Sequence, residues 1–302
     1  MPIGDLAPEI AIIVAAVLAL LFAALAPRRL QAGSAIIALA GIAVALALLL
    51  LQLGETRFTF SGTWALDGAS LWARVMILLA TGFCIMLSPD WFRTDLRHGE
   101  YYAILMLAAL GAMTMAGAGD LLQLVIAVLL SSVTGYTLAA WHRDWALSVE
   151  AGMKYFLMGA LANALLITGI VLILGLLGTS GYQDIAIALK LGKGLSPLLF
   201  VGFAMTITGV AFKLGAVPAH AWLPDVAEGA PVPSAAFLTV VPKIGAAIAL
   251  ARVVQLVPPE FMNLRELIAV LAVTTMTLGN LAALRQDDLR RLIGWSSVAQ
   301  AG

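Results

Sequence analysis

Long apolar runs follow one another along almost the whole chain, and they limit the folds open to it. A helix needs about 20 mostly apolar residues to cross the hydrocarbon core of a bilayer. Runs of that kind are separated by helix breakers such as Pro27 and Pro89. They predict spans near residues 9–26, 34–53, 67–88, 101–118, 121–141, 148–178, 197–217, 232–255 and 264–284, with another beginning near 288. The sequence therefore predicts an all-α polytopic membrane protein with about ten transmembrane helices.

The composition excludes several classes of function. Of the 302 residues, 62% are hydrophobic and 11% are charged, whereas soluble domains are about half apolar and about a quarter charged. A soluble enzyme of this length could not bury so much apolar surface, so lipid is the expected solvent. The formal net charge is zero, which gives no electrostatic reason to expect nucleic acid as a partner. Cys84 is the single cysteine, so the sequence predicts neither an internal disulfide nor an iron–sulfur site.

The spaces between the runs are short, and residues 1–302 are expected to form one membrane domain without a soluble module. Residues 55–65 alternate polar and apolar side chains, which predicts a small surface hairpin. Residues 183–194 predict an amphipathic turn at the membrane interface.

Basic residues are shared unequally between the two sides of the predicted membrane. Cytoplasmic loops are generally richer in lysine and arginine. The richer side carries Arg28, Arg29, Arg93, Arg97, Arg143, Arg285, Arg290 and Arg291. The other side carries Arg57, Lys190, Lys193 and Arg265, with Arg252 near a span end. This difference predicts that the N-terminus lies outside the cytoplasm.

Two lysines lie within predicted spans, where a charge is costly and is a candidate for function. Lys243 follows Pro233 by ten residues, which is about 15 Å along a helix and so near the midplane. Lys213 lies just before Gly215 and Pro218, which interrupt a segment too long for one straight span. This pattern is typical of a discontinuous helix, whose freed backbone groups must face protein or water.

A buried lysine can gain and lose a proton, because loss of hydration favours its neutral form and a nearby charge can reverse that preference. The alternative is a lysine that extends to the membrane surface. His220, beside the interruption, could relay protons. It could equally bind the backbone groups freed by Pro218 and Pro224.

Other charged residues have simpler interpretations. Glu150 and Lys154 are spaced as an i,i+4 ion pair at the start of a helix. Asp225 and Glu228 are expected to be solvated helix-end charges. Arg74, seven residues into its span, is expected to extend to the membrane surface.

Several segments resemble one family. They are His98-Gly99-Glu100-Tyr101-Tyr102-Ala103, the run Glu150–Leu157, the run Ala211–Pro218, the run Trp222–Pro231 and the run Leu278–Gln286. Together they are similar to subunit N of the proton-pumping NADH:quinone oxidoreductase, respiratory complex I. The antiporter-like subunits L and M and the cation/proton antiporter subunits share the lysine and Trp-Leu-Pro-Asp regions. The Gly-Glu-Tyr-Tyr segment and the Asp-Val-x-Glu-Gly-Ala-Pro run favour subunit N.

The resemblance implies an antiporter-like bundle with two inverted repeats, each containing a broken helix. Residues 1–100 would form the N-terminal helices, 101–255 the complete first repeat with its break near 213–218, and 256–302 the start of a truncated second repeat. The proton path would run through the broken-helix lysine, the central lysine and the family's histidine, which are Lys213, Lys243 and His220. The expected supporting residues are Glu150, Lys154, Asp225, Glu228, Ser132 and Tyr136.

This sequence departs from the family pattern in three places. Leu129 stands where the family usually carries a glutamate that pairs with the broken-helix lysine. Gln300 stands where a histidine is usual. The sequence stops at Gly302, inside the second repeat, and we expect it to be a fragment of a longer protein that cannot complete a proton path alone.

The resemblance thus implies a proton-translocating subunit of a translocase in the bacterial inner membrane, coupled to quinone reduction elsewhere in the complex. NADH, FMN, iron–sulfur clusters and quinone would bind other subunits, and this chain would hold no cofactor. Its expected partners are lipid and other complex I membrane subunits, with antiporter-like subunit M and the small subunit K as neighbours. Two alternatives remain: a cation/proton antiporter subunit, and a structural membrane subunit that no longer pumps, which Leu129 favours.

Overall fold

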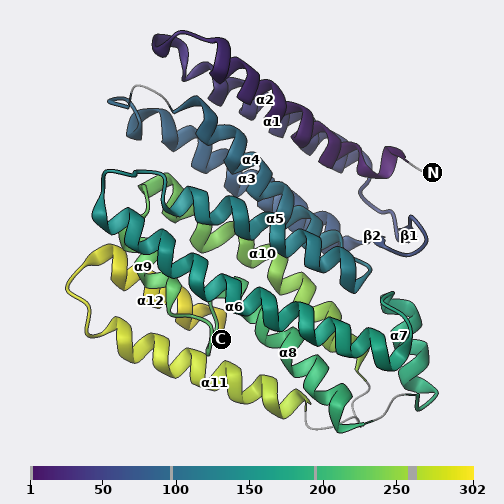
Figure 1. The fold of residues 1–302 in the computed structure, drawn as a ribbon. Helices are drawn as coiled ribbons and strands as arrows, with labels where there is room; N and C mark the ends of the chain where they lie inside the picture. Colours follow the sequence, from purple (N-terminus) through teal and green to yellow (C-terminus); the bar gives the residue numbers. More distant parts are fainter. Residues whose placement is uncertain (1–2, 96–97, 194–195, 258–263) are drawn as a thin grey trace.

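The structure is a computed structural model that describes residues 3–95, 98–193, 196–257 and 264–302. Within these ranges, nine helices are long and apolar enough to cross a membrane. They contain α1 (Ala7–Leu25), α2 (Gly33–Leu51), α3 (Gly68–Trp91), α4 (Gly99–Gly117), α5 (Leu121–Ala139), α6 (Ala146–Leu177), α8 (Pro197–Leu214), α10 (Val232–Leu256) and α11 (Leu264–Ala283). A further helix, α12 (Leu289–Ala301), begins where the tenth span was predicted. The all-α multi-pass membrane fold is therefore confirmed (Figure 1).

Two short elements lie outside the long helices. Strands β1 (Arg57–Thr59) and β2 (Trp64–Leu66) pair antiparallel, which confirms the predicted hairpin, although β2 is buried rather than on the surface. Helix α7 (Tyr182–Lys190) is amphipathic, as predicted for this segment, but it is a helix of 9 residues rather than a turn. Among the residues named in the sequence analysis, Arg97 and Gly194 lie outside the described residues.

The helices run back and forth between two ends of the bundle (Figure 1). We call one the hairpin end, because it holds β1 and β2. We call the other the arginine end, because its loops carry Arg28, Arg29, Arg93, Arg143 and Arg285. Helices α1 and α2 form one edge of the bundle and α11 the other, with α10 between them against α3, α4 and α8.

Helix α10 approaches α4 closely because Gly245 faces the backbone carbonyl of Ala112. Any side chain at this position would press on that carbonyl. The absence of a side chain at Gly245, two residues after Lys243, therefore allows α10 to pack closely against α4 in the middle of the bundle.

The expectation that Arg74 extends to the membrane surface is wrong. Its side chain is fully buried, and its Nη1 donates to Oε1 of Glu9 on α1 at 3.0 Å. Its Nη2 donates to Ser70 Oγ at 3.0 Å, and the guanidinium lies 5.1 Å from the ring centroid of Trp64. The prediction failed because it considered only the helix that carries Arg74, whereas the partner carboxylate lies 65 residues earlier.

Candidate functional site

The predicted interruption lies between α8 and α9 (Trp222–Gly229). Helix α8 ends at Leu214, and Gly215 follows in the left-handed conformation with φ +70°, which glycine adopts at little cost. The indole Nε1 of Trp222 donates to the carbonyl of Phe212 at 3.1 Å, and the amide of Val217 donates to Thr275 Oγ1 at 3.0 Å. These freed backbone groups are therefore satisfied inside the protein, as a break at membrane depth requires.

Lys213 occupies the last turn of α8 and is fully buried. Its Nζ donates to the hydroxyl of Tyr155 on α6 at 3.3 Å. The rings of Tyr155 and Phe212 lie with their centroids 5.5 and 5.6 Å from the same nitrogen. Among the described residues, no carboxylate forms an ion pair with Lys213. This buried amine therefore has one neutral hydrogen-bond partner and two aromatic neighbours.

Lys243 lies on α10 in a different environment. Its Nζ donates to the carbonyl of Ser297 at 2.6 Å and to the Ser297 hydroxyl at 2.7 Å, so the amine binds α12. Lys243 and Gln300 both line an open hollow of about 430 Å³. Gln300 is the residue that replaces the histidine expected from the resemblance. No ion pair joins Lys243 to a carboxylate in the described part of the chain.

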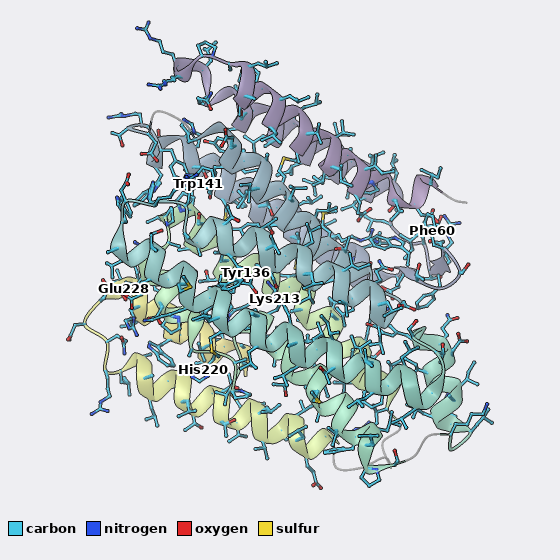
Figure 2. The ribbon with its side chains drawn as sticks, in the orientation of Figure 1. Phe60, Tyr136, Trp141, Lys213, His220 and Glu228 are labelled. Atoms are coloured by element: carbon cyan, nitrogen blue, oxygen red, sulfur yellow. The ribbon has the colours of Figure 1, made fainter. Side chains whose placement is uncertain are left out.

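His220 lies in the connection between the two halves of the broken helix and is half-buried. Its ring centroid is 5.6 Å from that of Trp295 on α12, and its Nδ1 is buried without a hydrogen-bond partner among the described residues. Figure 2 labels it beside α11 and α12, on the C-terminal side of Lys213. No direct hydrogen bond joins His220 to either lysine in the described structure, so a relay role stays a prediction.

The supporting charges form one network at the arginine end. Lys154 pairs with Glu150 at 2.7 Å, which confirms the predicted i,i+4 pair, and also with Asp225 at 3.1 Å. Arg291 Nη1 bridges Asp225 at 2.6 Å and Glu228 at 2.9 Å. Its hydrogen bond to the Glu228 carboxylate raises the pKa of the Arg291 guanidinium.

The prediction that Asp225 and Glu228 are solvated helix-end charges is therefore only partly right. They are partly buried and bind Arg291 of α12, a helix too distant in sequence for helical spacing to reveal. The network joins α6, α9 and α12 around a small polar hollow of about 150 Å³.

Ser132 and Tyr136 lie on α5, beside α6. Their hydroxyl oxygens are buried and have no hydrogen-bond partner among the described residues, and the same is true of Asn163 Oδ1 on α6. The ring of Tyr136 lies edge-on to that of Tyr155 with centroids 4.9 Å apart, which brings Tyr136 near Lys213 (Figure 2). Leu129, where the resemblance places a glutamate, is exposed on the same helix.

Sequence reasoning missed two residues that bind the lysines directly, Tyr155 and Ser297. Tyr155 follows Lys154 inside a motif that was recognised, but its contact with α8 spans 58 residues. Ser297 lies on the last helix and reaches Lys243 across 54 residues. Only the order of helix packing could have indicated either contact.

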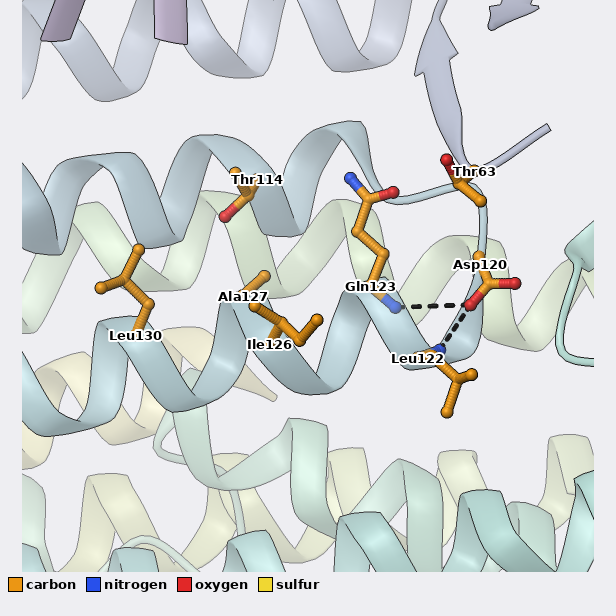
Figure 3. Close-up of a pocket in the computed structure, with 8 residues that line it drawn as sticks. All are labelled: Thr63, Thr114, Asp120, Leu122, Gln123, Ile126, Ala127 and Leu130. Carbon is orange, nitrogen blue, oxygen red and sulfur yellow. Dashed lines mark hydrogen bonds between the residues drawn. The ribbon is translucent and has the colours of Figure 1, made fainter. Parts of the chain in front are cut away.

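A separate hollow of about 400 Å³ lies along α5 near the hairpin end (Figure 3). Asp120 begins this helix and accepts hydrogen bonds from the amides of Leu122 at 2.6 Å and Gln123 at 3.4 Å. Ser180 donates to the other carboxylate oxygen at 2.7 Å. The Asp120 carboxylate is therefore engaged as a helix cap, and the exposed side chains of Leu122 and Ile126 make the rest of the hollow apolar.

Comparison with known proteins identifies the family of the chain. The family described as "NADH:quinone oxidoreductase/Mrp antiporter, TM" matches residues 118–302. NADH-quinone oxidoreductase subunit N 1 of Streptomyces griseus subsp. griseus is 41% identical over 98% of this chain and 63% of its own length. Subunit N of Trichlorobacter lovleyi is 36% identical over 98% of this chain and 61% of its own. The chain thus spans about three fifths of the length of these relatives.

Solved structures share the fold. A chain of respiratory complex I from Thermus thermophilus with bound aureothin superposes with a TM-score of 0.81 at 33% identity, covering 97% of this chain and 62% of that one. A chain of the Mrp complex from Dietzia sp. DQ12-45-1b gives 0.83 at 19% identity, covering 100% of this chain and 58% of that one, and supports the fold alone. The chain belongs to the NADH:quinone oxidoreductase/Mrp antiporter transmembrane family, and within it resembles the subunit N proteins of complex I.

Proposed function

We propose that the chain is a proton-translocating membrane subunit of an NADH:quinone oxidoreductase and moves protons through Lys213 and Lys243. One observation carries the proposal: both amines lie within membrane helices, and among the described residues neither forms an ion pair with a carboxylate. Quinone reduction in other subunits would supply the energy, and NADH, FMN and iron–sulfur clusters would bind there.

An amine without a fixed counter-charge can serve as a proton carrier in a medium of low dielectric constant. An adjacent carboxylate would favour the charged form strongly and hold the proton in place. The partners of both lysines are instead hydroxyl and carbonyl oxygens. Two ammonium groups repel each other in a medium of low dielectric constant. A proton that arrives at one lysine therefore favours release of the proton from the other, and protons can advance from one lysine to the next.

The remaining predicted residues have places in this scheme. His220, in the break, would link the two lysines through water. Glu150, Lys154, Asp225 and Glu228 would hold α9 in position at the arginine end, and Ser132 and Tyr136 would line the path beside Lys213. Residues 101–255 would form the first inverted repeat, with residues 256–302 beginning the second.

The positive-inside rule gives the proposed orientation. The arginine end would face the cytoplasm, with the N-terminus outside, in a bacterial inner membrane. Other complex I membrane subunits, including the antiporter-like subunit M and the small subunit K, are the proposed neighbours.

The proposal is tested by replacing Lys243 in the assembled complex. We expect Lys243→Ala to lower the number of protons transferred per electron, measured in vesicles with NADH and quinone, while assembly is retained. Lys190→Ala is the matched control, because Lys190 is exposed on α7 outside the spans. Unchanged pumping in Lys243→Ala would show that this chain is a structural subunit.

Purification of the assembled complex distinguishes the complex I assignment from the antiporter alternative. The family includes Mrp antiporters, and the fold is shared with an Mrp complex. If the protein that contains this chain co-purifies with iron–sulfur subunits, the complex I assignment stands. Cation-driven proton exchange without such subunits would support an antiporter instead.

A further inference from the structure

We propose that Tyr155 is a proton-relay residue, and that Tyr136 and Asn163 complete with it a neutral, water-holding lining that solvates the amine of Lys213. This inference rests on the proposed function and assigns the group that receives the proton from Lys213. Its starting observation is the single hydrogen bond of this amine within the described residues, to the Tyr155 hydroxyl at 3.3 Å.

Tyr155 is fixed firmly beside the interrupted helix. It is fully buried, and its ring stacks on that of Trp222 with centroids 4.1 Å apart and planes 18° apart. Trp222 is held in turn by its hydrogen bond to the carbonyl of Phe212. The hydroxyl of Tyr155 is therefore set at the amine by the same contacts that close the break.

The polar groups beside this pair lie close together, since Ser132 and Asn163 are within reach of the Tyr136 hydroxyl. A lysine ammonium has three donors, and the described residues accept one of them. The hydroxyls of Ser132 and Tyr136 and Oδ1 of Asn163 are buried without partners in the described structure. An unsatisfied buried polar group costs about 1–3 kcal/mol, and buried water commonly satisfies several such groups at once.

The α5–α6 interface is shaped around the two tyrosine hydroxyls. The hydroxyl of Tyr136 lies over Gly159 of α6, and that of Tyr155 lies over Gly135 of α5. A methyl group at Gly159 would collide with the Tyr136 hydroxyl, and one at Gly135 would lie 3.1 Å from that of Tyr155. Residues 155, 159 and 163 share one face of α6 at helical spacing. Each helix thus provides a glycine opposite the hydroxyl of the other.

This arrangement can carry a proton without a carboxylate. The phenol oxygen accepts a proton from the Lys213 ammonium while its own O–H releases a proton to a water on the far side. The products are a neutral amine, an unchanged tyrosine and a protonated water, so one proton has moved and the charge balances. Rotation of the hydroxyl restores the starting state.

The test is Tyr155→Phe in the assembled complex, because phenylalanine keeps the stacked ring and removes only the hydroxyl. We expect the rate of proton transfer through this chain to fall about tenfold, as loss of a hydrogen bond to a charged group implies, with assembly and electron transfer retained. We also expect the pH profile of proton transfer to move. Asn163→Leu should lower proton transfer by a smaller factor.

Tyr182→Phe is the matched control. Tyr182 is buried like Tyr155, but its hydroxyl has no hydrogen-bond partner in the described structure. It lies on α7, outside the spans. Full proton transfer and an unchanged pH profile in Tyr155→Phe would overturn the relay. If Lys213→Met still abolished pumping in that case, the proposed function would stand without a relay at Tyr155. If Lys243→Ala pumped normally, the proposed function itself would fail.

Discussion

Two buried cations in this protein have opposite surroundings. Arg74 lies between α1 and α3, where Glu9, Ser70 and the ring of Trp64 engage its guanidinium. Lys213 lies beside the broken helix, where a tyrosine hydroxyl is its one hydrogen-bond partner among the described residues. Both side chains are fully buried.

The difference indicates what each charge is for. Arginine remains protonated in proteins, and a bound carboxylate holds its charge in place, so the Arg74–Glu9 pair joins two helices permanently. A lysine with neutral partners can exist in either protonation state. Pairing therefore distinguishes a structural buried charge from one that can take part in transport, and the following predictions test that distinction.

The largest effect on stability is expected from Arg74→Met. Removing one partner of a buried ion pair costs about 3–5 kcal/mol, because the other charge is left buried alone. The measurement is the free energy of unfolding of the purified protein in mild detergent. Arg57→Met is the control, since Arg57 is half exposed in its pair with Asp5 and such pairs contribute about 1 kcal/mol or less. Equal losses in the two variants would contradict the distinction.

Gly159→Ala is expected to cause the next largest loss of stability. The added methyl group meets the hydroxyl of Tyr136, and overpacking of a close interface costs about 1–3 kcal/mol. The same unfolding measurement applies, with Gly175→Ala as control because nothing lies near that glycine. A double variant Gly159→Ala with Tyr136→Phe should recover part of the loss. No recovery would show that the hydroxyl is not what fills the space.

Arg291→Gln should cost about 1 kcal/mol, because its ion pairs with Asp225 and Glu228 are partly exposed to solvent. High salt should reduce the difference between this variant and the unmodified protein, since salt screens such pairs. If the variant instead lost several kcal/mol of unfolding free energy independently of salt, the network would be shielded from solvent in the way the Arg74–Glu9 ion pair is.

Lys213→Met should change stability least, by about 1 kcal/mol or less, and could raise it. It replaces a buried amine, which has one neutral hydrogen-bond partner among the described residues, with an apolar side chain of similar length. Proton transfer per electron should nevertheless be lost. A stability loss as large as that of Arg74→Met would show that Lys213 is a structural charge, contrary to the comparison.

The sequence predicted the spans well because each apolar run is bounded by clear breakers. The break after Lys213 was equally clear, since Gly215 allows the left-handed turn that ends α8. The partners of the charges were not predictable in the same way. Glu9, Tyr155 and Ser297 reach Arg74, Lys213 and Lys243 from distant helices.

These missed contacts share one physical cause. Helical spacing identifies neighbours on one helix, but which helices pack together depends on small residues such as Gly245 and Gly159 across the whole bundle. Asp225 and Glu228 illustrate the limit, because their local sequence gave no sign of Arg291. Their place inside predicted spans identified Lys213 and Lys243, and the motif resemblance matched them to family positions, while their surroundings required the structure.

The central claim is that the intramembrane amines act by releasing their protons, and Lys243→Arg tests it most directly. Arginine keeps the positive charge and can still donate hydrogen bonds to Ser297, which is the present partner of Lys243. However, arginine does not deprotonate in proteins. The measurement is protons transferred per electron in the assembled complex. We predict that Lys243→Arg loses proton transfer as fully as Lys243→Ala does, and normal transfer in Lys243→Arg would contradict the claim.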